Sequence, residues 1–285
     1  MKLVRYGKAG KEQPGVLDGK GRIRDCSEYV DDIAGDDLSP KHLKKIARAL
    51  KRDELPVVRG QPRIGACVGR PTNFIAVGLN YADHAAESNM PIPGEPILFN
   101  KAPNCIVGPN DDIVQPKSST RLDWEVELGV VIGKRASYVD EDAAMEHVAG
   151  YCLANDVSER EFQLERGGNW MKGKSAPTFG PLGPWLVTAD EIADPQAIDL
   201  WLDVNGERMQ SGSTNTMIFP VRKLVSYISH FLTLEAGDVI VTGTPPGVGS
   251  GKKPPVYLKP GDTIRLGGAG LGEHAARVVA WDARD

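Results

Sequence analysis

The sequence predicts an α+β fold that is rich in β-strands. Its 285 residues include 32 glycines and 21 prolines without a collagen-like period, which indicates many tight turns. From residue 74 onward, short apolar strands are punctuated by turn residues, and the regular strand–helix alternation of a doubly wound sheet is absent. A segment rich in Gly, Pro and Arg at 59–73 precedes this part. We therefore expect a small N-terminal α+β domain at 1–70 and a larger β-rich domain at 71–285.

Three patterns predict the elements of the N-terminal domain. Residues 2–6 are typical of a strand, and the run PGVLDGKGRIRD at 14–25 predicts a hairpin with its turn at Asp18-Gly19. Ser39 followed by Pro40 is typical of a helix start. The helix itself follows from apolar residues at i, i+3, i+4 and i+7, namely Leu43, Ile46, Ala47 and Leu50.

The larger domain is predicted as a series of strands with one longer helix. Residues 201–204 end in Asn205-Gly206, a strong hairpin signal. The spacing of Leu224, Ile228 and Phe231 predicts a helix at 220–232. The other expected strands lie at residues 74–78, 122–133, 151–154, 238–242, 263–266 and 275–281.

Composition and charge disfavour several classes of protein. A net charge of −4 disfavours a general nucleic-acid binder. The four cysteines stand far apart, with no CxxC pair and no neighbouring histidine, which suits reduced thiols better than zinc or disulfides. The N-terminus lacks a signal-peptide core, and no apolar run approaches the roughly 20 residues that span a bilayer. We expect a soluble cytoplasmic protein with no nucleic-acid or membrane partner.

The strongest local signal is the run LDWEVELGVVI at 122–132. Successive side chains on a strand face opposite sides, so Glu125 and Glu127 are expected to point the same way. Two carboxylates side by side on an apolar strand repel each other unless a cation lies between them. With no His or Cys nearby, a hard cation such as Mg²⁺ or Mn²⁺ fits better than zinc. The alternative is the solvated face of an edge strand.

Asp156 adds a third carboxylate. It follows the strand expected at 151–154, and the end of a strand is a common place for a ligand side chain. The alternative is a helix N-cap, a role that Asp fills well and that Ser158 could take instead.

Two further patterns are compatible with catalysis. His84 and Glu87 stand at i, i+3 on one helical turn, where a carboxylate would raise the basicity of the imidazole, as a water-activating base requires. The alternative is a surface ion pair. Lys174 lies in a Gly-rich segment, where its charge could neutralise a carboxylate or a developing enolate. The alternative for Lys174 is an exposed lysine that serves solubility.

From about residue 70 to the end, six ordered motifs resemble those of the fumarylacetoacetate hydrolase family. They are VGLNYADHAAE (77–87), PILFNK (96–101), LDWEVELGVVIGK (122–134), GYCLANDVSEREFQ (150–163), KGKSAPTFGPLGP (172–184) and VTGTPPGVG (241–249). The resemblance implies a mixed β-sheet roll, a homodimer or dimer of dimers, and a small-molecule keto acid as substrate. It also implies Mg²⁺ or Mn²⁺ as the cofactor.

The resemblance assigns roles to ten residues. They are the metal ligands Glu125, Glu127 and Asp156; the water-activating pair His84 and Glu87, on a lid at 81–95; the enolate-stabilising Lys174; and the substrate-pocket residues Tyr81, Arg160, Gln163 and Thr244. Some members carry an additional carboxylate ligand ahead of the position of Tyr81. Gly78-Leu79-Asn80 stands there in this chain, so we expect three protein carboxylates.

The expected activity is Mg²⁺-dependent hydrolysis of the C3–C4 bond of a 2,4-diketo acid. Among bacterial subgroups of the family, the chain most resembles the 2,4-diketo-3-deoxy-L-rhamnonate hydrolases, which release pyruvate and L-lactate, and the ureidoglycolate lyases. The pair His84 and Glu87 favours hydrolysis, because water attack needs a base. The alternatives on the same scaffold are a ureidoglycolate lyase, an oxaloacetate-type decarboxylase and an isomerase of 2-oxo-diene-dioates. A non-enzymatic alternative is a metal-dependent keto-acid binding protein.

Overall fold

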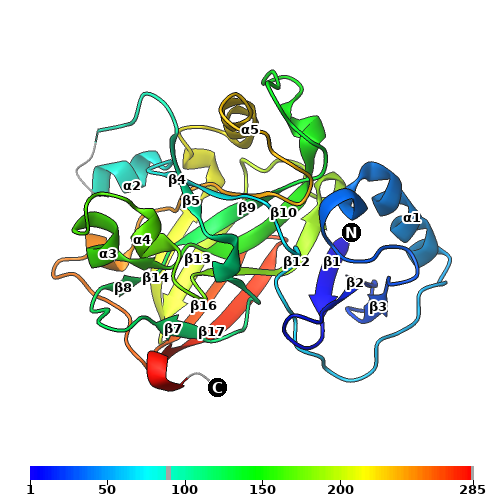
Figure 1. The fold of residues 1–285 in the computed structure, drawn as a ribbon, viewed down its shortest axis with the longest axis horizontal. Helices are drawn as coiled ribbons and strands as arrows, with labels where there is room; N and C mark the ends of the chain where they lie inside the picture. The colour runs from blue at the N-terminus through cyan, green and yellow to red at the C-terminus, as the bar shows by residue number, and fades with distance from the viewer. Residues whose placement is uncertain (88–90, 284–285) are drawn as a thin grey trace.

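The computed structural model describes residues 1–87 and 91–283, and it contains mixed β-sheets with few helices (Figure 1). The predicted β-rich α+β fold is therefore confirmed. Residues 88–90, inside the expected lid segment 81–95, lie outside the described residues. Within the described part, no helix is both long and apolar enough to cross a membrane.

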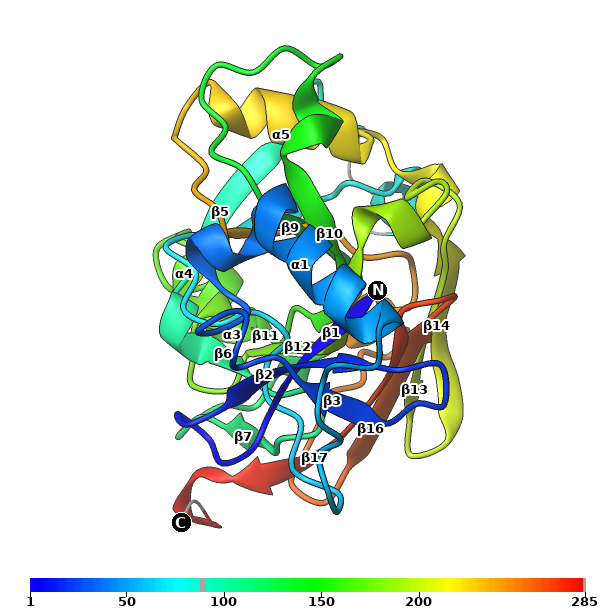
Figure 2. The ribbon, with the colours of Figure 1, turned by 90° about the vertical axis from the view of Figure 1, so that its right-hand side faces the viewer.

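The N-terminal strands belong to the largest sheet. Strands β1 (Lys2–Tyr6), β2 (Gln13–Leu17) and β3 (Ile23–Asp25) pair antiparallel in sequence, as the hairpin pattern predicts. β1 also pairs with β12 (Gly180–Thr188), which joins this hairpin to the rest of the sheet. Helix α1 (Pro40–Lys51) begins at the predicted proline and lies beside these strands, at the end of the molecule opposite α2–α4 (Figures 1 and 2).

The centre of the largest sheet holds the strands from which the candidate site is built. From β12 the order continues through β10 (Val148–Asn155), β9 (Val126–Ile132), β15 (Val239–Val241), β4 (Phe74–Gly78) and β5 (Ile97–Lys101), and β6 (Ile106–Val107) pairs with β12. All residues of β9 and β10 are buried. β4 and β15 run parallel, although they are far apart in the chain.

A second sheet of five strands packs beside the first. Its order is β14 (Glu207–Ser213), β13 (Asp199–Val204), β16 (Thr263–Gly268), β17 (Gly272–Ala280) and β7 (Ile113–Gln115). The predicted turn Asn205-Gly206 connects β13 to β14, and both residues have a positive φ. The inner faces of the two sheets contribute to one hydrophobic core.

The remaining elements are short. β8 (Leu122–Asp123) pairs with β11 (Ser158–Glu159), and the other helices are α2 (Ala82–Glu87), α3 (Arg160–Leu164), α4 (Met171–Lys174) and α5 (Val221–Ser229). Short 3₁₀ turns lie at Gly35–Leu38, Pro103–Cys105, Ala144–His147, Ala189–Glu191, Thr214–Thr216, Gly249–Gly251 and Trp281–Ala283. The single strand expected at 122–133 is divided into β8 and β9, and the helix expected at 220–232 ends three residues early.

Candidate active site

Three carboxylates converge where β9 begins and β10 ends. Glu125 immediately precedes β9, Glu127 is its second residue, and Asp156 immediately follows β10. Glu127 pairs directly with Ala154 across the two strands, and the backbone N–H of Asp156 donates to the carbonyl of Glu125 at 2.9 Å, so Asp156 lies across from Glu125. All three side chains are buried, and each offers an oxygen within 4.8 Å of the others.

The alternatives left open by the sequence do not hold for these carboxylates. β9 is an interior strand rather than an edge, so Glu125 and Glu127 are not on a solvated face. The N-cap of α3 is Glu159, whose side chain accepts from the backbone N–H of Glu161. Asp156 therefore caps no helix here, and the hydroxyl of Ser158 donates to the carbonyl of Asp156 instead.

Two fully buried lysines hold Asp156. Lys174 Nζ lies 2.7 Å from Asp156 Oδ2 and 2.8 Å from Glu125 Oε2, so one ammonium bridges two carboxylates. Lys101 Nζ lies 2.5 Å from Asp156 Oδ1 and also donates to the backbone carbonyl of Lys174. Burial alone would lower the pKa of Lys174, but the charges of Asp156 and Glu125 outweigh it and raise that pKa. Lys174 is therefore a charged member of the site, not an exposed surface lysine.

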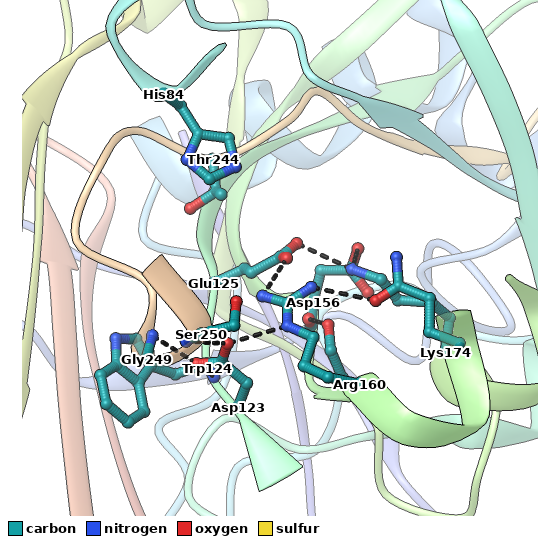
Figure 3. Close-up of polar contacts among 12 residues, drawn as sticks. His84, Asp123, Trp124, Glu125, Asp156, Arg160, Lys174, Thr244, Gly249 and Ser250 are labelled. Carbon is teal, nitrogen blue, oxygen red and sulfur yellow. Dashed lines mark hydrogen bonds and ion pairs between the residues drawn. The ribbon is translucent and has the colours of Figure 1, made fainter. Parts of the chain in front are cut away.

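Arg160 ties Glu125 to the neighbouring loop (Figure 3). Its Nε lies 2.8 Å from Asp123 Oδ2, and its Nη2 lies 2.7 Å from Glu125 Oε1. Asp123 is itself fixed by the backbone N–H groups of Gly249 at 2.7 Å and Ser250 at 2.9 Å. Although burial opposes it, the charges of Lys174 and Arg160 lower the pKa of Glu125 to about 2, so this carboxylate is ionised.

Glu127 differs from the other carboxylates in its charge balance. Across residues 1–87 and 91–283, no basic side chain forms an ion pair with it, and its Oε2 accepts from Gly243 N–H at 2.8 Å. Burial, together with the charges of Asp156 and Glu125, raises the pKa of Glu127 well above its usual value. When Asp123 is included, the site holds four carboxyl groups and three basic groups, which are Lys101, Lys174 and Arg160. The ligand atoms that the three converging carboxylates offer to a cation are all oxygens. This arrangement fits a hard divalent cation bound by Glu125, Glu127 and Asp156.

The histidine and its carboxylate partner form a separate, well-anchored unit. His84 and Glu87 lie on one turn of α2, as predicted, with His84 Nδ1 at 3.2 Å from Glu87 Oε2. Both oxygens of Glu87 accept from Gly247 N–H at 3.1 Å. Glu87 therefore orients the imidazole and also fastens α2 to the loop that contains Thr244. Figure 3 shows His84 and Thr244 together on one side of Glu125.

A cavity of about 60 Å³ lies between these groups. Of the predicted site residues, those that line it are His84, Glu125, Glu127, Asp156, Gln163, Lys174 and Thr244. Glu87, Tyr81 and Arg160 do not line the cavity. Glu87 contacts the lining residue His84, and Arg160 contacts the lining residue Glu125. Tyr81 is completely buried, and its hydroxyl has no hydrogen-bond partner within the described residues. Burial and the nearby charge of Glu127 raise the pKa of Tyr81.

Lys101 and Asp123 are not among the residues predicted from the sequence, although both contact the predicted site. Lys101 ends the motif PILFNK and follows the exposed Asn100, so no local pattern marks it as buried. Asp123 lies two residues before Glu125, in the same acidic run. Its role depends on Arg160 and on the backbone at Gly249, neither of which is adjacent to it in sequence.

Comparison with known proteins identifies the family of this chain. Residues 73–279 match the fumarylacetoacetate (FAA) hydrolase C-terminal family. A protein of Burkholderia cenocepacia (strain HI2424), whose name provisionally gives hydrolase activity and no substrate, is 60% identical over 279 residues, with 98% of this chain and 99% of that one covered.

Solved structures agree with this assignment. The fumarylacetoacetate hydrolase of Exiguobacterium antarcticum has a TM-score of 0.84 and 39% identity, covering 98% of this chain and 99% of that one. A 5-carboxymethyl-2-hydroxymuconate delta-isomerase of Mycobacterium smegmatis has a TM-score of 0.77 and 31% identity, covering 98% and 100%. The chain belongs to the fumarylacetoacetate hydrolase family. It is thus an enzyme of a superfamily that contains hydrolases and isomerases.

Proposed function

We propose that this enzyme hydrolyses the C3–C4 bond of a 2,4-diketo acid in a reaction that depends on Mg²⁺ or Mn²⁺. We further propose 2,4-diketo-3-deoxy-L-rhamnonate as the specific substrate, with pyruvate and L-lactate as products. The observation that carries the hydrolysis is the position of His84, which faces the three buried carboxylates across a small cavity and is oriented by Glu87. The specific substrate rests on the resemblance to that bacterial subgroup.

The cation would be held by Glu125, Glu127 and Asp156. When bound, it would supply a Lewis acid that polarises the carboxylate and 2-keto oxygens of the substrate and stabilises the negative charge that develops there. Arg160 and Lys101 hold Glu125 and Asp156 in place, since each lies within hydrogen-bond distance of a carboxylate oxygen. Preorganised charge of this kind is commonly the largest contribution to catalysis.

His84 is the proposed general base. Its Nδ1 faces Glu87, so the carboxylate favours the tautomer whose Nε2 is free to accept a proton. His84 takes a proton from water, and the hydroxide adds to the C4 carbonyl. The C3–C4 bond then breaks, its electron pair forms the enolate of pyruvate, and C4 leaves as a carboxylic acid.

Lys174 is the proposed stabiliser of that enolate. Its charged ammonium lies within 3 Å of two proposed ligands, Glu125 and Asp156, and therefore beside the position proposed for the keto acid. The proton that His84 removed from water can return to C3, which completes pyruvate and restores the base. One water is consumed in each turnover, and the protons balance.

The test is a stopped assay of the purified protein against acetylpyruvate, 2,4-diketo-3-deoxy-L-rhamnonate, oxaloacetate and ureidoglycolate, with Mg²⁺ or with EDTA. We expect metal-dependent release of pyruvate from the diketo acids, and loss of that release in His84→Ala. Turnover of oxaloacetate or ureidoglycolate alone would refute the water-attack step and favour a decarboxylase or a lyase. Stereospecific release of L-lactate from the rhamnonate derivative tests the specific substrate.

We also propose that the enzyme acts in the cytoplasm as a homodimer or a dimer of dimers. The four cysteines are buried free thiols, which agrees with a reducing compartment. The oligomeric proposal rests on the family resemblance, and light scattering on the purified protein tests it.

A further inference from the structure

One wall of the active-site cavity is apolar. Its apolar lining residues are Val77, Gly78, Leu79, Phe99 and Trp170, and Lys174 Nζ lies 5.3 Å from the centre of the Phe99 ring. Phe99 and Trp170 meet edge to face, with ring centroids 5.3 Å apart. The indole ring also packs on the backbone of Gly78, because a Cβ added there would lie 2.6 Å from Trp170 Cζ3. The two aromatic rings and the end of β4 form a wall whose own side chains carry no charge, which we call the apolar wall.

The cationic groups at this cavity are already engaged. Lys174 is bridged by Glu125 and Asp156, and His84 is paired with Glu87. The remaining polar side chains that line the cavity, Gln163 and Thr244, are neutral, and Gln163 accepts from Arg160 through its Oε1. Within the part of the chain that the structure describes, the cation that lies against the apolar wall is Lys174 over Phe99, and its charge is already matched by two carboxylates, so the wall offers no unmatched counter-charge to an anion.

We infer that the acyl end of the substrate, beyond the attacked carbonyl, is short, uncharged and terminated by alkyl carbon, and that the site discriminates against keto acids with a second, distal carboxylate. This inference rests on the proposed function, which directs the first carboxylate to the carboxylate cluster and its cation. The acyl end must then contact the apolar wall, since the cavity is small. An ionised group buried there without a partner is strongly disfavoured, whereas a methyl group is favoured.

The apolar wall also has a movable part. Trp170 is half-buried and follows Gly167 and Gly168, which both have a positive φ and little around them. The cavity of about 60 Å³ is smaller than typical small-molecule sites of roughly 300 Å³ or more. Displacement of the indole ring is thus the way in which the wall can enlarge for a longer alkyl end.

The test uses two keto acids of equal length that differ only at the far end. 2-Oxoheptanoate ends in a methyl group, 2-oxoheptanedioate ends in a carboxylate, and neither has a C4 carbonyl that water could attack. Calorimetric titration of the wild-type protein with each acid, in the presence of Mg²⁺, measures binding independently of turnover. We expect the methyl-ended acid to bind at least about 100-fold more tightly, because burial of an unpaired carboxylate costs several kcal/mol.

Two pairs of variants locate the discrimination. Trp170→Arg places a cation in the wall and should improve binding of the dioate at least about tenfold, whereas the control Met171→Arg places the same charge on an exposed neighbour outside the cavity lining and should not. Gly78→Ala should push the indole inward and weaken binding of the methyl-ended acid. Its control is Gly19→Ala, where an added Cβ meets nothing within 4 Å.

The possible outcomes separate this inference from the proposed function. Equal or tighter binding of the dioate by the wild-type protein would overturn the inference and leave the diketo acid hydrolase intact. Binding of neither acid in the presence of Mg²⁺ would overturn both, because the first carboxylate and 2-keto group are then not recognised. Preference for the methyl-ended acid that is lost in Trp170→Arg but kept in Met171→Arg would support the apolar wall as its source.

Discussion

Removal of the buried Lys101 ammonium is expected to destabilise the protein severely. Lys101 is 1% exposed, its Nζ lies 2.5 Å from Asp156 Oδ1, and it also donates to the carbonyl of Lys174. In Lys101→Met the side chain keeps most of its volume and loses the charge and both hydrogen bonds. Asp156 is then left with Lys174 as its one cationic partner among the described residues, in a cluster that already holds an excess of carboxylates.

The size of the effect follows from burial. Loss of one partner of a buried ion pair costs about 3–5 kcal/mol, because the remaining charge stays away from water. For a protein of this size, that corresponds to a fall in melting temperature of roughly 10 °C. Mg²⁺ should restore part of the loss and should stabilise Lys101→Met more than the wild type, since the variant site carries one more net negative charge.

Urea and thermal unfolding with and without Mg²⁺ measure both effects. Lys45→Met, the same substitution on the exposed face of α1, is the matched control and should change the free energy of unfolding by less than about 0.5 kcal/mol. The double variant Lys101→Met/Asp156→Asn should lose less than the sum of the two single variants, because the two side chains are in contact. A loss below about 1 kcal/mol in Lys101→Met would refute the reasoning.

Three further predictions concern other ionisable groups. His84→Ala should keep Mg²⁺ binding in calorimetry and lose at least about 100-fold in turnover of a diketo acid, since a general base contributes that much; retained turnover would exclude His84 as the base. Glu127→Gln should keep or raise the melting temperature without metal, because it removes repulsion with Asp156 and Glu125, but should abolish the stabilisation by Mg²⁺; stabilisation equal to that of the wild type would exclude Glu127 as a ligand. His274 is buried and its pKa is lowered to about 4, chiefly by burial, so the unfolded state takes up the proton first as the pH falls from about 6.5. Stability should therefore be lost by about 3 kcal/mol at pH 4, and His274→Gln should lose correspondingly less between pH 7 and pH 4 in urea unfolding; an unchanged pH dependence in the variant would contradict this assignment.

The sequence predicted the elements whose signals are local. The apolar spacing and the Ser39-Pro40 pair located α1, and Asn205-Gly206 located the hairpin of β13 and β14. Glu125 and Glu127 were recognised because period-two alternation is readable in a short run. The break between β8 and β9 was not predicted, because it depends on a tertiary contact. The carboxylate of Asp123 accepts from Trp124 N–H and from the backbone N–H of Gly249 in a distant loop.

The parts of the site that were not predicted depend on tertiary burial. Lysines are usually exposed, so neither the burial of Lys174 nor that of Lys101 can be read from the residues around them. The pairing of Arg160 with Asp123 joins positions 37 residues apart. Similarly, Trp170 lies in a segment without strong local periodicity, and only the folded chain brings its ring against Gly78.

The parallel pairing of β4 with β15 has a consequence for how the protein folds. β15 begins at Val239 and pairs with Phe74, and the backbone N–H that fixes Glu127 belongs to Gly243, 116 residues further along the chain. Glu127 therefore meets its backbone partner only after most of the polypeptide has been synthesised and the sheet has closed. Such distant pairings make folding slow, and a cation that needs the assembled cluster cannot guide its early steps. Bound metal should accordingly slow unfolding and leave the refolding rate almost unchanged.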